Sequence, residues 1–120
     1  MHRFIRYCAV GAAATATHYG LLAAAVALAG WPAWVGAGVG AVVGAQVAYF
    51  GNSRYTFAGA SRGHAAWWRF QVTAVIGALV SMAVVATTVW AGGHYLAGQV
   101  LATGLALLLT FGVNRHWTFA

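Results

Sequence analysis

The chain has 120 residues, 62% of them hydrophobic and 5% charged, and every charged residue is an arginine, which gives a formal net charge of +6 at pH 7. A water-soluble domain carries roughly 25% charged residues, so this composition excludes a soluble globular protein. The length also leaves no room for a soluble catalytic domain beside membrane-spanning segments.

Four apolar segments follow one another, and each approaches the roughly 20 residues with which a helix crosses the hydrocarbon of a bilayer. Gly30-Trp31-Pro32 separates the first pair of segments and Gly92-Gly93 the second pair, since glycine and proline favour turns. A polar loop over about 51–65 joins the two pairs. The sequence therefore predicts an all-α membrane protein with four transmembrane helices, over about 4–28, 34–50, 67–90 and 95–113.

The arginines occupy only three places: the N-terminal start, the region from the middle loop to the beginning of the third span, and the C-terminal end. The two short turns carry none. The positive-inside rule predicts that both termini and the middle loop face the cytoplasm. Because these cations lie beside membrane spans, we expect membrane lipids as partners, through their phosphates, and no nucleic acid.

The two halves of the chain are similar, which predicts one domain over 1–120 that is built as two parallel two-helix repeats, about 3–57 and about 69–119. Arg3-Phe4 matches Arg69-Phe70 at the start of each half. The segment 52–57, NSRYTF, matches the segment 114–119, NRHWTF, and both follow the pattern N-x-x-[YW]-T-F at the end of an even-numbered span.

Small residues recur at every fourth position of the second and fourth spans and therefore line one face of each helix. We expect these faces to pack closely against neighbouring helices, as in G-x-x-x-G pairing, and to offer contacts for a homo-oligomer. The helix-packing candidates are Gly36, Gly40, Gly44, Gly98, Ala102 and Ala106.

Arginine and asparagine side chains at the same end of the spans form a candidate site for a lipid phosphate or headgroup. Guanidinium groups bind phosphate oxygens in bidentate fashion, and a terminal amide can bond to a headgroup. The alternative roles are topological anchoring for the arginines and helix C-capping for the asparagines. The candidates are Arg3, Arg6, Asn52, Arg54, Arg69, Asn114 and Arg115.

Three polar residues fall within the apolar spans and are candidates for a headgroup pathway: His18, Gln46 and Gln99. Ionisable residues inside a membrane are rare and are functional candidates by default. The alternative role for all three is a structural hydrogen bond between helices.

The chain has no aspartate or glutamate, which excludes carboxylate-held metal ions and hydrolysis by paired carboxylates. Cys8 is the single cysteine, and the spacing of the histidines indicates no metal site. We therefore expect a non-enzymatic protein with no catalytic residue, no metal and no cofactor.

The basic-aromatic start, Arg3-Phe4 before Val10-Gly11, followed by two spans and an N-x-x-[YW]-T-F end, all repeated, resembles the GtrA-like family over residues 3–119. The resemblance implies a small four-span protein of the bacterial cytoplasmic membrane that functions in cell-surface polysaccharide synthesis. It further implies translocation, or flipping, of a polyprenyl-phosphate-linked sugar, and a glycosyltransferase as partner.

Two other functions remain open on the sequence. A non-catalytic membrane anchor or scaffold for a polyprenyl-phosphate glycosyltransferase would use the same arginines and aromatic residues without a pathway. A small multidrug exporter has a similar length, but that class relies on a membrane-embedded glutamate, and this chain has no such residue.

Overall fold

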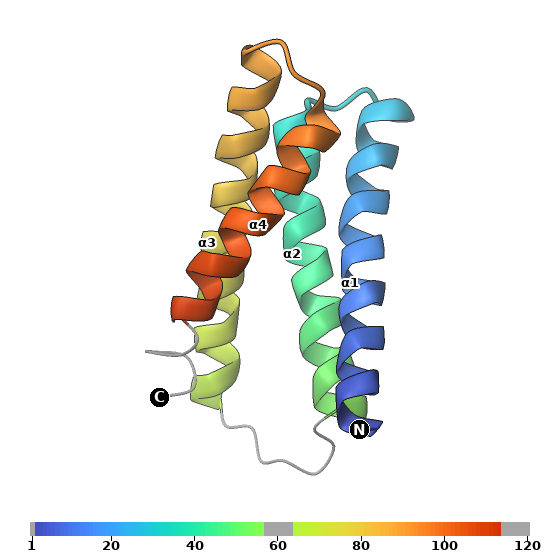
Figure 1. Cartoon of the computed structure of the whole chain (residues 1–120), viewed down its shortest axis with the longest axis vertical. Coiled ribbons are helices and arrows are strands. Elements are labelled where there is room, and N and C mark those ends of the chain that lie inside the picture. The colour runs from blue at the N-terminus through green and yellow to red at the C-terminus, as the bar shows by residue number, and fades with distance from the viewer. Residues whose placement is uncertain (1, 57–63, 114–120) are drawn as a thin grey trace.

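Four antiparallel helices account for most of the described chain, which in this computed structural model comprises residues 2–56 and 64–113. The helices run up and down in chain order (Figure 1), and this confirms the predicted all-α fold with four helices. A π-helical turn, η1 (Asn52–Thr56), continues the second helix. The helices are α1 (His2–Ala27), α2 (Ala33–Gly51), α3 (His64–Trp90) and α4 (Tyr95–Val113).

The lengths of these helices match a bilayer. At 1.5 Å per residue, the 26 residues of α1 extend about 39 Å and the 19 residues of α4 about 28 Å, against a hydrocarbon core of about 30 Å. Within residues 2–56 and 64–113, three segments are long and apolar enough to cross a membrane: Ile5–Ala27, Ala33–Tyr55 and Trp67–Trp90. The fourth helix is shorter, with an apolar stretch over Tyr95–Ala106. The chain is therefore a multi-pass membrane protein.

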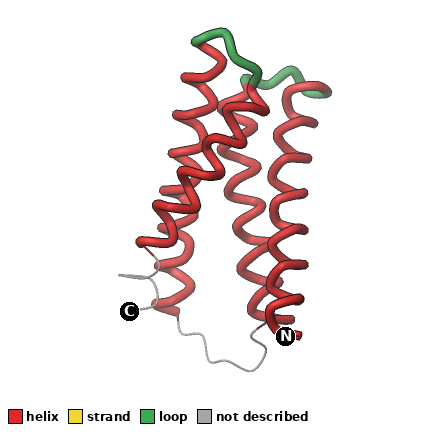
Figure 2. The backbone as a smooth tube through the Cα atoms, viewed as in Figure 1, coloured by secondary structure: helices red, strands yellow, loops and turns green. Residues whose placement is uncertain are grey.

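Both short turns lie where glycine and proline predict them, at one end of the bundle (Figure 2). Gly30 and Gly92 adopt φ angles of 68° and 92°, a left-handed conformation that glycine adopts without a side-chain clash. We call this end the turn end. The opposite end, where α1 and α3 begin and where Arg6, Arg54 and Arg69 lie, is the basic end.

The connection between α2 and α3 is shorter than predicted. Instead of a loop from residue 51, the chain stays helical through η1, and α3 begins at His64. The backbone of Asn52 adopts the right-handed helical conformation, with φ −69° and ψ −38°. Its N–H donates to the carbonyls of Ala48 and Tyr49, so Asn52 continues the helix. No glycine or proline interrupts residues 52–56, and the Arg6 guanidinium donates to the Tyr55 carbonyl, which satisfies one of the terminal acceptors.

The bundle is apolar outside and mixed inside. Large side chains such as Leu101, Leu105 and Leu108 are exposed, where lipid chains would contact them. The interior combines apolar residues such as Leu22 and Val85 with buried polar side chains. In the described chain α1 packs on α2, α2 on α3 and α3 on α4, which gives two helical hairpins joined by α2 and α3. That these hairpins are repeats of one unit stays a prediction.

The glycine face of α2 packs inside the chain. A Cβ at Gly36 would contact Leu22 and Ala25 of α1, and Gly40 and Gly44 likewise approach α1. On α4, Gly98 approaches Thr88 of α3. The α2 face is therefore covered by α1, and it is not available as the contact that we expected for a second copy. Oligomerisation itself stays a prediction.

Candidate functional site

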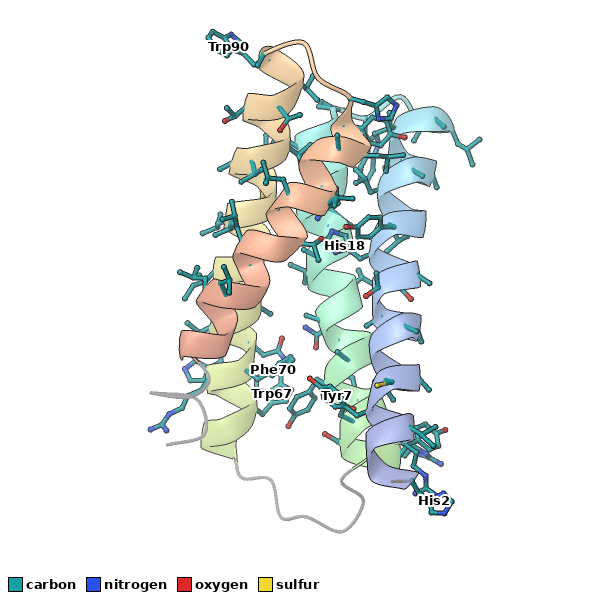
Figure 3. All side chains as sticks on the ribbon, in the orientation of Figure 1. His2, Tyr7, His18, Trp67, Phe70 and Trp90 are labelled. Atoms are coloured by element: carbon teal, nitrogen blue, oxygen red, sulfur yellow. The ribbon has the colours of Figure 1, made fainter. Side chains whose placement is uncertain are left out.

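His18 lies midway along the bundle, between α1 and its neighbours (Figure 3). Its ring is accommodated by Gly40 of α2, because a Cβ there would lie 2.8 Å from Cδ2 of His18 and 2.6 Å from its backbone oxygen. Gly44 holds the same position one turn further, where a Cβ would lie 3.2 Å from the His18 Cβ. Gly40 and Gly44 of the glycine face of α2 thus make room for a polar residue at membrane depth.

A polar layer at the same depth joins α1 to α4. The Tyr19 hydroxyl lies 2.7 Å from Oγ1 of Thr103 and donates to the Gln99 carbonyl at 3.3 Å. Thr103 Oγ1 donates to that carbonyl at 2.8 Å, and Gln99 Nε2 donates to Thr103 Oγ1 at 3.3 Å. These bonds hold α1 and α4 together although the two helices do not pack along their described length.

Two buried atoms beside this layer have no hydrogen-bond partner among the described residues: Nε2 of His18 and Oε1 of Gln99. Gln99 is fully buried, and its side chain lies next to the His18 ring. A buried polar group without a partner is costly, so these neighbouring atoms either bond to each other after a small rearrangement or take up a water or a ligand. A single hydroxyl group, which both donates and accepts, can bridge a donor and an acceptor of this kind.

A cavity of about 280 Å³ extends from His18 toward the basic end. All four helices contribute to its wall. Phe70, which contacts the Tyr49 ring with centroids 5.0 Å apart, lies at its lower side, below His18 in Figure 3. The polar side chains of the wall are Thr15, His18, Thr73, Ser81 and Thr103.

Asn52 and Arg69 lie at the basic end of this cavity by helical register. Asn52 follows the wall residue Ala48 by four positions, and Arg69 precedes Thr73 by four. Both are half-buried, and Thr73 Oγ1 donates to the Arg69 carbonyl at 2.9 Å. These two headgroup candidates therefore lie about one helical turn beyond the wall toward the basic end, a position that we call the mouth of the cavity.

Arg6 and Arg54 belong to a different place, a pocket between α1 and η1 that shares no wall residue with the central cavity. The repeated motif predicted two similar polar clusters, in one of which Arg54 stands beside the Asn52 amide. Residues two apart on a helix face away from each other, so the cluster divides between two faces of the α1–α2 hairpin.

Gln46 lies outside the cavity wall and pairs with Gln71 of α3. Gln46 Nε2 donates to Gln71 Oε1 at 2.5 Å, and Gln71 Nε2 donates back to Gln46 Oε1 at 3.1 Å. This reciprocal pair is the interhelix bond that the sequence left as the alternative role for Gln46.

The other candidates are less fully placed. The Arg3 side chain, Asn114 and Arg115 lie outside the part of the chain that is described. Ala102 is fully buried on α4, and Ala106 contributes to the cavity wall. Among the described residues, no group of three histidine or cysteine side chains is placed to hold a metal ion.

Sequence reasoning missed several polar residues of the interior: Tyr19, Gln71, Thr73, Ser81 and Thr103. One signal was present, since Thr103 follows Gln99 by four positions and so shares its helix face. Thr73 likewise follows Arg69 by four. Tyr19 gives no comparable signal, because its place next to His18 in the sequence does not indicate a partner on the fourth span.

Comparison with known proteins gives one match. A family model described as "GtrA/DPMS, transmembrane domain" matches residues 6–119, nearly the whole chain. No curated protein and no solved structure matches.

Proposed function

The chain belongs to the GtrA/DPMS transmembrane-domain family, which is associated with membrane proteins of glycosyl-lipid and polysaccharide synthesis, and we propose that it moves a polyprenyl-phosphate-linked sugar across the bilayer. Members of the family are generally non-catalytic, which agrees with a chain that has no carboxylate side chain for acid–base chemistry.

The observation that carries the proposal is the central cavity with its polar wall inside an apolar bundle. A sugar in the hydrocarbon region would lose its hydrogen bonds to water, at a cost of several kcal/mol. The hydroxyls of Thr15, Thr73 and Ser81 offer replacement bonds in the wall. The unpartnered Nε2 of His18, which is a wall residue, and the unpartnered Oε1 of the neighbouring Gln99 add a donor–acceptor pair beside the cavity.

The rest of the lipid fits the surroundings of the cavity. Arg69 at the mouth supplies a cation for the phosphate, with the Asn52 amide on the facing helix. The polyprenyl chain stays in the bilayer and passes between α1 and α4, which diverge toward the basic end (Figure 1). We call the interface between α1 and α4 the seam. The hydrogen bonds around Tyr19 close the seam on the side of the cavity that faces the turn end.

Reconstitution tests the proposal. Purified protein is placed in liposomes that carry a radiolabelled polyprenyl-phosphate hexose in both leaflets, and external periodate oxidises the exposed sugar. We expect the protein to expose inner-leaflet sugar, and His18→Leu or Gln99→Leu to slow this by about tenfold through the loss of a buried hydrogen bond. His2→Leu, an exposed histidine at the start of α1, serves as the matched control and keeps the wild-type rate.

Translocation would be refuted if liposomes with protein protected the inner-leaflet sugar from periodate to the same degree as liposomes without protein. If the same preparation still co-purifies with a polyprenyl-phosphate glycosyltransferase, the scaffold function is supported instead. Equal rates for the wild type and both cavity variants would retain translocation but remove the cavity as its path.

A further inference from the structure

The second pocket, of about 520 Å³, lies at the basic end between α1 and the segment formed by α2 and η1. We call it the outer pocket. Residues that are consecutive in the sequence line different pockets. Ala13 and Val47 line the outer pocket, whereas Ala14 and Ala48 line the central cavity. The outer pocket therefore opens on the opposite side of the α1–α2 interface, and nothing in the proposed translocation uses it.

Arg6 and Arg54 both line this pocket, and each interacts with Tyr55. Arg6 donates from Nη1 to the Tyr55 carbonyl at 3.2 Å, which uses one of its five N–H groups. The Arg54 guanidinium carbon lies 5.9 Å from the centre of the Tyr55 ring. Cations from two different helices are thus kept in one pocket despite their mutual repulsion.

No side chain of this protein can neutralise these charges, because the sequence contains no aspartate or glutamate. An anion from outside the chain is therefore the natural partner for these two exposed guanidinium groups. The remainder of the pocket wall is apolar, with Ala9, Val10, Ala13 and Val47 on the side toward the bilayer centre. Ala9 and Ala13 are exposed, so the pocket is open to the surrounding lipid.

We propose that Arg6 and Arg54 together bind the phosphodiester of an anionic membrane phospholipid, whose acyl chains lie along the apolar wall of the outer pocket. An amphiphile matches a site with cations at one end and alanine and valine above them, whereas inorganic phosphate matches only the cations. The bound lipid bridges α1 and η1 and holds the N-terminal helix against the end of α2. The proposal goes beyond translocation and does not depend on it.

Lipid binding by the purified protein in detergent tests this site. Dioleoylphosphatidylglycerol, dioleoylphosphatidylcholine and inorganic phosphate are titrated separately, and the thermal unfolding midpoint and the bound lipid in native mass spectra are measured. We expect phosphatidylglycerol to raise Tm, and we expect neither phosphatidylcholine nor inorganic phosphate to do so. Arg6→Gln and Arg54→Gln each weaken its apparent Kd by about tenfold, because each removes a charge-assisted contact.

His2→Gln is the control, since His2 is an exposed polar residue at the same end of the bundle that lines neither the outer pocket nor the central cavity. It should retain the phosphatidylglycerol effect and the lipid adduct. The proposal is overturned if the adduct survives in the Arg6→Gln/Arg54→Gln double variant, if His2→Gln weakens binding equally, or if phosphatidylcholine or inorganic phosphate gives the same rise in Tm. Native mass spectra also decide the case for a variant whose unfolding loses cooperativity.

Discussion

Substituting Gly40 by alanine would separate α1 from α2 at the depth of His18. The new methyl group would lie 2.6 Å from the His18 carbonyl oxygen and 2.8 Å from ring atom Cδ2. The ring can turn away, but the carbonyl belongs to the α1 backbone and cannot. The helices must therefore move apart, and the ring must leave its position beside the cavity.

The size of the effect follows from two opposing contributions. Overpacking of this kind costs about 1–3 kcal/mol. Alanine gains up to about 1 kcal/mol over glycine in helix propensity. In a membrane that gain shrinks, because the separated helices stay helical in lipid. We expect Gly40→Ala to lower the free energy of unfolding by about 1–2 kcal/mol.

Gly20→Ala provides the matched control on α1. A Cβ at Gly20 meets nothing within 4 Å, and the residue is exposed. This variant should be as stable as the wild type or more stable, by up to about 1 kcal/mol. Unfolding in mixed micelles by titration with sodium dodecyl sulfate, followed by circular dichroism, measures both variants. If Gly40→Ala proves as stable as Gly20→Ala, the close contact of α1 with α2 at His18 is wrong.

Two further variants test the polar contacts between helices. Gln46→Leu or Gln71→Leu alone should lower the free energy of unfolding by about 1–2 kcal/mol, since the remaining amide loses its partner. The double variant should lower it by less than the sum of the two single effects. Additive effects in this double-mutant cycle would contradict the reciprocal pair. Tyr19→Phe removes the hydroxyl that joins α1 to α4, so hydrogen exchange in α4 around Gln99 should accelerate, whereas Tyr7→Phe, at an exposed position, should leave it unchanged. Equal exchange in both variants would show that the Tyr19 bonds do not hold the seam.

The helices could be predicted because membrane spans leave a coarse and robust signal. Long apolar runs predict the four helices, and Gly30 and Gly92 mark the two turns. The end of α2 could not be placed in the same way. Polar residues after Gly51 indicate a loop by composition, yet nothing in 52–56 breaks a helix, and a bond from the distant Arg6 satisfies its end. The continuation thus depends on tertiary contacts as well as on local sequence.

The candidate site could be predicted in its residue types but not in its grouping. His18 stands out because an ionisable residue in an apolar span is rare. The pairing of Gln46 with Gln71 depends on how α2 and α3 align, which no local pattern specifies. Asn52 and Arg54 are two residues apart in one motif, and the helix turns them to different faces. A linear motif therefore combined a residue at the cavity mouth with a residue of the outer pocket.

The contacts between helices also indicate where the bundle would open for a sugar. Within the first hairpin, glycines bring α1 and α2 into close contact, and a lipid bound by Arg6 and Arg54 would strengthen the same interface. Between the hairpins, α2 and α3 are joined by the Gln46–Gln71 pair and by the Tyr49–Phe70 contact. The seam between α1 and α4 relies on the bonds around Tyr19. His18 belongs to α1 and Gln99 to α4, so this least-packed interface borders the polar groups that a sugar would bind. On the proposed function, the hairpins separate there and pivot about α2 and α3.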